Sequence, residues 1–217
     1  MTKTNSKTTK VQKTKFRIQT GVEAEKAVTA VDLLKKELTI ATSGYAKGDV
    51  VELSGLGMLD GVYPVEKVAS DKVTLCAEVD WTGYDAPTVF TTAKAKRVIF
   101  SSQFCLIKNI EKSEDTVSVE DVTTICDDGT VTEPGEIEFG SIKLSYSFVP
   151  DDEMQTLLRN TFYAKKDFAY KTEFPDGRGT LYGYGFLESG NAYSGEVKGR
   201  FDSSCSIKPK KRDYLMV

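Results

Sequence analysis

The chain has 217 residues, of which 40% are hydrophobic and 28% are charged, and its formal net charge is −3. This balance is ordinary for a globular protein of one large or two small domains, and it argues against a disordered or membrane-dominated chain. The sequence contains no histidine, so it lacks the commonest general base and the commonest metal ligand. Most hydrolytic chemistry is therefore disfavoured, although a pair of carboxylates remains possible. We expect a protein that is not an enzyme and has no catalytic residue, metal or cofactor.

Charge is distributed unevenly along the chain. Residues 1–15 contain five lysines and no acid, which predicts a flexible basic N-terminal arm. The terminal segments 1–15 and 208–217 hold nine of the 29 basic residues but one of the 32 acids, so residues 16–207 carry a net charge of −11. Apolar runs are too short to span a bilayer and no secretory leader is visible, so we expect the protein to stay in the cytoplasm where it is made.

The first predicted strand begins at Lys15, and residues 16–27 are assigned to a main β domain that resumes at 98. Between 28 and 97, short strands are predicted at 37–42, 49–54, 61–68 and 72–79, separated by turns that contain glycine or aspartate. Turns at intervals of about 8 to 12 residues are typical of a small barrel or sandwich. We interpret 28–97 as an inserted small β-barrel-like domain.

The only tryptophan, Trp81, lies in this insert close to Tyr84 and Pro87. An aromatic side chain beside glycine and proline can form a platform for a sugar or a peptide, but a single tryptophan more often closes a small core. A β-rich adhesin or carbohydrate-binding module is therefore the alternative function. The glycine-rich segment 44–49 lacks the ending and the following helix of a phosphate-binding loop.

Two other groups of residues could suggest chemistry. The chain has four cysteines and no C-x-x-C pair: Cys76, Cys105, Cys126 and Cys205. Three of them fall within strand-like alternation, which favours small buried apolar residues over metal ligands or disulfides. Neighbouring carboxylates occur at 127–128 and at 151–153. Loop composition explains the first pair and helix capping explains the second group, so neither indicates catalysis.

Strand-like segments over 96–113 and 114–126 precede an acidic segment. Val117, Val119 and Ile125 alternate with polar residues, as in a strand with one wet face. Residues 127–136 then combine four acids with two glycines and a proline. This composition cannot bury enough apolar surface to order itself alone, so it predicts a surface loop.

The segment from 138 to 208 predicts the order β-α-β-β-β. Ile142, Leu144 and Tyr146 alternate with polar residues in the first strand. A helix is expected over 151–162, because Pro150 and three acids precede apolar residues at the spacing of one helical face. Its expected core-facing residues are Met154, Leu157, Leu158 and Phe162.

Three strands are expected after the helix, at 168–174, 180–188 and 195–208. In the last one, Val197, Phe201, Cys205 and Ile207 alternate with Glu196, Lys198, Arg200 and Asp202. One face should therefore be core and the other polar. A shift of one residue in register would exchange these faces.

The features of residues 98–212, taken together, resemble the major tail tube proteins of long-tailed (siphovirus) bacteriophages, lambda type. The resemblance is carried by the order of an acidic loop, a strand ending at Pro150, a helix from Asp151 to about Phe162, Ala169-Tyr170-Lys171 with Phe174-Pro175-Asp176-Gly177, and a closing strand ending in Lys208-Pro209. It implies a mainly β fold, a tail-tube β-sandwich or barrel with one flanking α-helix, assigned to 16–27 and 98–212 and followed by a C-terminal tail at 213–217.

The resemblance also implies a structural role. Six copies would form a ring, rings would stack, and the channel would deliver double-stranded DNA into the host without holding it. Partners would be further copies and the tape measure, tail tip and tail terminator proteins, with no membrane partner, and the protein would reside in the virion tail after synthesis in the host cytoplasm. A secretion-system tube or a contractile-tail tube would share this fold, so whether the tail is contractile stays open, although the long acidic loop and the insert favour the non-contractile version.

Two sets of residues follow from this resemblance and from the strand pattern. The candidate lumen-facing residues are Ser118, Glu120, Lys143, Ser145, Ser147, Glu196, Lys198, Arg200 and Asp202. The candidate inter-ring loop residues are Asp127, Asp128, Glu133 and Glu136. An ordinary solvent-exposed sheet face and an ordinary surface loop are the simpler interpretations of the two sets.

Overall fold

The computed structural model describes residues 12–41, 44–126 and 128–217. The chain divides into two compact units. Unit 1 combines the residues up to Cys105 with Phe168–Tyr184 and Asp213–Val217, and unit 2 combines Leu106–Asp167 with Gly185–Arg212. The predicted class, mainly β with one α-helix and a small barrel, is confirmed within the described residues.

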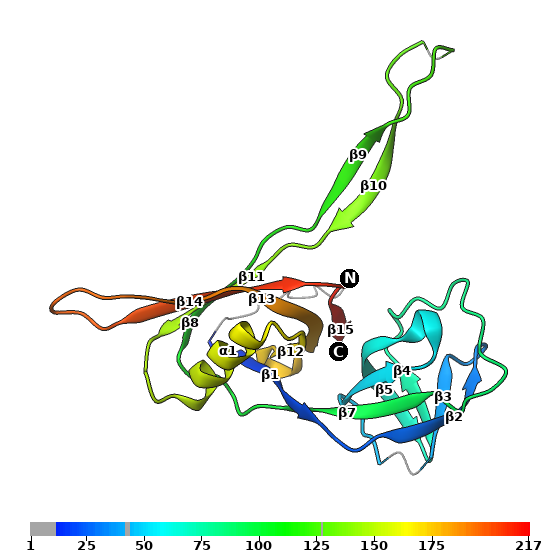
Figure 1. Cartoon of the computed structure of the whole chain (residues 1–217), viewed down its shortest axis with the longest axis horizontal. Coiled ribbons are helices and arrows are strands. Elements are labelled where there is room, and N and C mark those ends of the chain that lie inside the picture. Colours follow the sequence, from blue (N-terminus) through cyan, green and yellow to red (C-terminus); the bar gives the residue numbers. More distant parts are fainter. Residues whose placement is uncertain (1–11, 42–43, 127) are drawn as a thin grey trace, which may run out of the picture. The chain divides into compact units, whose positions relative to one another are not determined.

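Unit 1 contains a closed barrel of six strands (Figure 1). The strands follow the order β2, β3, β6, β5, β4, β7, and pairing of Lys26 and Ala27 on β2 with Ala95 and Lys94 on β7 closes the ring. Their bounds are β2 Lys26–Asp32, β3 Glu37–Ile40, β4 Val50–Ser54, β5 Gly61–Ala69, β6 Lys72–Leu75 and β7 Lys94–Phe100, with a 3-10 turn, η1, at Gly57–Leu59. Closure leaves no unpaired edge in the barrel.

Alternating apolar residues fill the barrel. Leu38, Val51 and Val65 are fully buried inside it. Trp81 is partly buried against this core, and its ring meets the ring of buried Tyr84 edge-on at 6.0 Å between centroids. The tryptophan therefore helps to close the core and does not form an open aromatic platform.

The rest of unit 1 extends the sheet beyond β7. β1 (Lys15–Val22) pairs with β7 and with β12 (Phe168–Glu173), and β15 (Tyr214–Met216) pairs with the first residues of β13. A second 3-10 turn, η2, lies at Pro175–Gly177. The rings of Phe16 and Tyr170 stack at 6.2 Å, and the Tyr170 hydroxyl donates to the Asp213 carboxylate at 2.8 Å.

Unit 2 is built on an antiparallel sheet of four strands. β8 (Ile107–Lys112), β11 (Ile142–Ser147), β14 (Asp202–Pro209) and the second half of β13 (Thr180–Ser194) are neighbours in that order. β9 (Thr116–Asp121) and β10 (Thr132–Glu138) form a separate two-stranded hairpin. β8 pairs with β11 and ends the sheet order, so it is an edge strand within unit 2.

The helix α1 (Glu153–Ala164) belongs to unit 2. Asp152 caps its N-terminus by accepting a hydrogen bond from the Gln155 amide at 3.0 Å, and Lys165 ends the helix in a left-handed conformation. A Cβ placed on Gly190 of β13 would lie 3.9 Å from both the Phe162 ring and the Cys205 Cβ. The helix therefore packs against the apolar face of β13 and β14.

Three sequence predictions about the strands were wrong. β14 begins at Asp202, and Gly195–Phe201 form the loop of the β13–β14 hairpin, in which Val197 and Phe201 are exposed. β13 continues past Glu188 to Ser194. The pairing with β14 shifts register after Leu187 and again after Ser189, and these irregularities let the strand continue through Gly190. Residues 132–138 are strand β10, since a register shift between Pro134 and Ile137 accommodates the proline and Gly135.

Candidate functional site

One face of the unit 2 sheet is polar on neighbouring strands. On β11, Lys143, Ser145 and Ser147 are exposed or half-buried, whereas the alternating residues Ile142, Leu144 and Tyr146 are buried. The register pairs Lys143 with Ser206, Ser145 with Ser204 and Ser147 with Asp202 on β14. Because paired residues of antiparallel strands point to the same side, these six side chains share one surface, which we call the polar face.

Charges on and around the polar face are largely paired. Lys108 on β8 donates to Asp202 on β14 at 2.5 Å, and Lys208 donates to Glu138 at 2.8 Å. The hydrogen bond from Lys208 lowers the pKa of Glu138. The Glu188 carboxylate accepts hydrogen bonds from Ser141 at 2.9 Å and from Ser206 at 3.3 Å. The face is therefore hydrophilic without a concentration of either sign.

A shallow hollow of about 340 Å³ lies on the same face. Its lining includes Lys143, Ser145, Tyr193, Asp202 and Ser204. Hydroxyl groups dominate this lining, and no group of three or more Cys, Asp or Glu side chains in the described residues is placed to hold a metal ion. The hollow is a polar surface feature with no arrangement suited to nucleophilic or metal chemistry.

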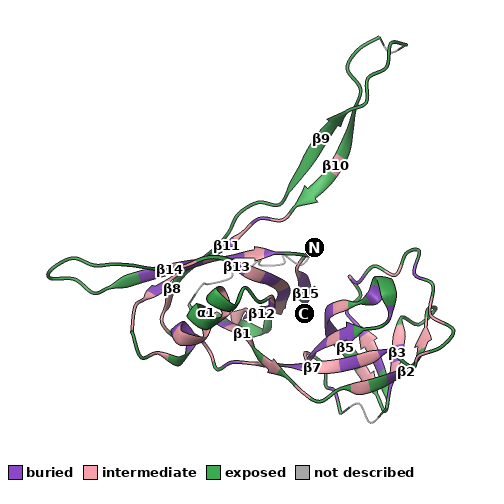
Figure 2. Ribbon diagram, viewed as in Figure 1, coloured by how far each residue is buried: buried purple, intermediate pink, exposed green. Residues whose placement is uncertain are grey.

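The β9–β10 hairpin is acidic and exposed along both strands (Figure 2). Residues 114–138 contain nine acids and no base. Glu120 pairs directly with Glu133 across the strands, and like charges placed opposite each other destabilise a sheet. Gly135 lies beside them, and a Cβ there would lie 2.4 Å from the Ser118 hydroxyl and 2.7 Å from a Glu120 carboxylate oxygen, so both side chains would have to move to admit a larger residue.

The base of this hairpin is fastened by one carboxylate. Asp115 accepts a hydrogen bond from the Gly140 N–H at 2.8 Å and pairs with Lys112 at 3.2 Å. The Gly140 hydrogen bond is the main reason that the pKa of Asp115 lies below its ordinary value of 3.8. Asp115 precedes β9 and Gly140 follows β10, so this hydrogen bond joins the two ends of the hairpin.

Apolar side chains are exposed on the hairpin to an unusual extent. Val117 and Val119 on β9 lie opposite Ile137 and Pro134 on β10, so they form one apolar face. Six apolar side chains of the hairpin are exposed: Val117, Val119, Val122, Ile125, Val131 and Ile137. An isolated two-stranded hairpin is marginally stable at best, and exposed apolar surface of this kind indicates a contact site.

The predicted lumen-facing residues fall into three places. Lys143, Ser145, Ser147 and Asp202 lie together on the polar face. Ser118 and Glu120 alternate with Val117 and Val119 on β9, as expected, but β9 belongs to the separate hairpin. Glu196, Lys198 and Arg200 lie in the β13–β14 loop and not on the strand that alternation indicated. Among the predicted inter-ring residues, Asp128 lies in the turn of the hairpin and Glu133 and Glu136 lie on β10, whereas Asp127 lies outside the described residues.

The helix residues also divide by burial. Met154 and Leu158 are buried, whereas Leu157 and Phe162 are half-buried. Sequence reasoning missed Gln155, which is buried and whose side chain donates to the Ser147 carbonyl at 2.8 Å and accepts from the Val149 N–H at 3.1 Å. A glutamine three residues after a capping aspartate does indicate a helix start, but that pattern places its hydrogen bond on the N-cap N–H and does not predict the bonds to Ser147 and Val149.

Two of the four cysteines are buried and two are exposed. Cys76 and Cys205 are buried, and Cys105 and Cys126 are exposed, so the expectation of three buried thiols was wrong. Burial raises the pKa of the Cys205 thiol to about 12. No helix in the described residues is both long enough and apolar enough to cross a membrane.

The sequence matches no protein-family model and no curated protein. The solved structures that share limited similarity with the chain include the following two. A chain of a native gene transfer agent (GTA) virion aligns at a TM-score of 0.44 with 18% identity, over 54% of this chain and 88% of that chain. The SPP1 tail tube, studied by solid-state NMR and cryo-EM, aligns at a TM-score of 0.37 with 16% identity, over 64% of this chain and 73% of that chain. At these scores neither likeness supports a conclusion about function.

Proposed function

We propose that the protein is the structural subunit of a phage tail tube, in which hexameric rings stack to form a channel for DNA delivery. The observation that carries the proposal is the β9–β10 hairpin, which exposes six apolar side chains and places Glu120 opposite Glu133. A two-stranded hairpin is marginally stable alone, and exposed apolar side chains of this kind mark a contact surface for another molecule. The sequence resemblance of residues 98–212 to lambda-type tail tube proteins supports a further copy of the chain as that molecule.

The unit 2 sheet supplies a second incomplete surface. β8 is an edge strand within this unit, and an edge strand offers unpaired N–H and C=O groups to a neighbour. Joining such sheets around a rotation axis removes the edges and closes a larger barrel. In the proposed ring, the four-stranded sheets of six copies form this barrel and their polar faces line the channel.

The chemistry of the polar face suits the passage of DNA. DNA carries about one negative charge per 1.7 Å of axis, and each phosphate that is neutralised by a lysine or arginine adds salt-dependent affinity. A strongly basic lining would therefore hold DNA. Lys108 is paired with Asp202, and the remaining positions around them are mostly serine, so the proposed lining is hydrophilic and nearly neutral.

The remaining assignments follow from the same proposal. The hairpin with Asp128, Glu133 and Glu136 would contact a neighbouring ring, and tape measure, tail tip and terminator proteins would meet the two ends of the tube. The barrel formed by strands β2 to β7 would be a module carried by the tube domain. The protein would act in the virion tail after synthesis in the host cytoplasm, without catalysis or a cofactor.

Assembly of the purified protein tests this function. We expect concentrated protein to sediment as rings or longer assemblies and to appear as hollow rods under negative stain. Val119→Asp should suppress assembly, because it places another carboxylate on the apolar face of the hairpin. Leu34→Asp is the matched control, since Leu34 is an exposed apolar residue of the barrel. A wild-type protein that stays monomeric at every concentration and ionic strength would contradict the proposal.

A further inference from the structure

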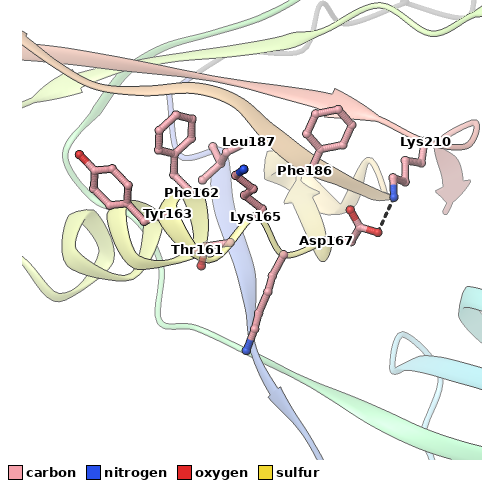
Figure 3. Close-up of a pocket in the computed structure, with 9 residues that line it drawn as sticks. Thr161, Phe162, Tyr163, Lys165, Asp167, Phe186, Leu187 and Lys210 are labelled. Carbon is pink, nitrogen blue, oxygen red and sulfur yellow. Dashed lines mark hydrogen bonds and ion pairs between the residues drawn. The ribbon is translucent and has the colours of Figure 1, made fainter.

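A groove lies at the C-terminal end of α1 in unit 2 (Figure 3). It has a volume of about 440 Å³, which is enough for several apolar side chains, and its apolar lining is Phe162, Tyr163, Phe186 and Leu187. The rings of Phe162 and Tyr163 meet edge-on at 5.6 Å, and the Tyr163 side chain is mostly exposed. The groove is therefore an accessible apolar site on the helix end.

Lysines surround this groove. Lys165, Lys166 and Lys210 contribute to its lining. Lys210 is held by Asp167 at 2.5 Å and lies 5.8 Å from the centre of the Phe186 ring. Figure 3 shows Lys165 extending toward Leu187, and within the described part of the chain this lysine has no ion-pair partner. The groove therefore suits an apolar occupant that also carries negative charge.

The turn of the β9–β10 hairpin has this chemistry. Ile125 is fully exposed, so it contacts little of its own chain. Val122 and Val131, which are also exposed, are joined by a backbone hydrogen bond of 3.0 Å, and Asp121 and Asp128 lie beside them. We call residues 121–131 without 127 the hairpin tip. It presents apolar side chains at its end and carboxylates around them.

The geometry points to docking of the hairpin tip of one copy into the helix-end groove of another copy, with Ile125 in the groove and Asp128 near Lys165. This inference rests on the proposed self-assembly and specifies its contact. The apolar part of the contact removes Ile125 and Val122 from water, and the acid–lysine pairing sets the orientation of the two copies. The contact would cover both the exposed hairpin tip of one copy and the open helix-end groove of the other.

Charge exchange tests the contact in full-length protein. Ile125→Ser should raise the concentration needed for assembly by about tenfold or more, because it removes the buried side chain. Lys165→Glu should weaken assembly in the same way, and the double variant Lys165→Glu with Asp128→Lys should restore it. Val197→Ser and Lys198→Glu are matched controls, because both residues lie in the exposed β13–β14 loop.

Disulfide trapping tests the contact without tubes. Cys126 is exposed next to Ile125, so a Tyr163→Cys variant, with Cys105→Ser to remove the other exposed thiol, should form an intermolecular disulfide when oxidised by diamide. A variant with Leu34→Cys in place of Tyr163→Cys is the control and should not form this dimer.

The outcomes separate the docking contact from the tail-tube role. Tubes that form equally well with Ile125→Ser and with Lys165→Glu would overturn the docking contact and leave the tail-tube role standing. A disulfide between Cys126 and the thiol introduced at Tyr163, in a protein that never forms tubes, would support the docking contact and overturn the tail-tube role. Absence of both the disulfide and the tubes would overturn both.

Discussion

Gln155 joins the start of α1 to the end of β11, and its removal should destabilise unit 2. Its side-chain amide donates to the Ser147 carbonyl at 2.8 Å and accepts from the Val149 N–H at 3.1 Å. Each bond is worth about 1 to 1.5 kcal/mol when its loss leaves a partly buried backbone group unsatisfied. Alanine regains a few tenths of a kcal/mol through helix propensity. We expect Gln155→Ala to lower the free energy of unfolding by about 2 kcal/mol.

Urea denaturation followed by far-ultraviolet circular dichroism measures this change, because α1 contributes the α-helical signal of the described chain. Fluorescence of Trp81, which lies in unit 1, reports the barrel in the same samples. Asn160→Ala is the control, since Asn160 is exposed on the same helix and should change stability by less than about 0.5 kcal/mol. A Gln155→Ala variant as stable as the control would refute the role assigned to these two hydrogen bonds.

Three further predictions concern other parts of the chain. Because the pKa of Asp115 is depressed in the folded protein, its bond to Gly140 should stabilise the hairpin base above the ordinary pKa of 3.8 and be lost as pH falls below it, which amide exchange at Gly140 measures. Gly55→Ala should lower the melting temperature of the barrel, because Gly55 has a φ of +75° and an added Cβ would lie 2.4 Å from the Thr92 carbonyl oxygen. Cys205 should react with a thiol reagent only after unfolding, since burial raises its pKa to about 12.

Each of these predictions has a clear contrary result. Amide exchange at Gly140 that is unchanged by Asp115→Asn at neutral pH would show that this carboxylate does not fasten the hairpin. A Gly55→Ala variant with the melting temperature of the wild type would show that the turn at Gly55 accepts a Cβ without loss of stability. Reaction of Cys205 in the native protein at the rate of the exposed Cys126 would show that unit 2 opens readily.

Period-two alternation predicted strands well where one face is buried by neighbours. In β11, Ile142 and Leu144 are buried, and Lys143 between them is exposed. The same alternation continues through Val197 and Phe201, where the structure has a loop. Alternation shows that a segment could lie on a half-buried sheet, but it carries no information about whether another strand is present to cover it.

Strand length was harder to predict than strand position. Gly190 predicts a turn when it is read locally, and the bulged register of β13 carries the strand past it. In the extended part of β13, the Tyr193 ring stacks on the Phe148 ring, with 5.0 Å between their centroids. This contact joins residues that are distant in sequence, so local patterns could not predict it.

The candidate site was predictable only where its residues lie on one strand, because local patterns carry no information about contacts between distant segments. The sequence identified the serine and lysine positions of β11, because one strand carries them all. It could not place Glu120 opposite Glu133, since that pairing depends on the register across the hairpin. Nor could it identify the groove around Phe162 and Phe186, whose walls come from a helix and a strand that are distant in sequence.

A cryo-EM reconstruction of the assembled protein tests the proposed tail-tube role most directly. We expect a hollow tube with six subunits per ring, in which Lys143, Ser145 and Ser147 of each copy border the channel and the β9–β10 hairpin reaches a neighbouring copy. A solid fibre, or a tube whose channel is lined by other elements while these three residues face the exterior, would contradict the proposal.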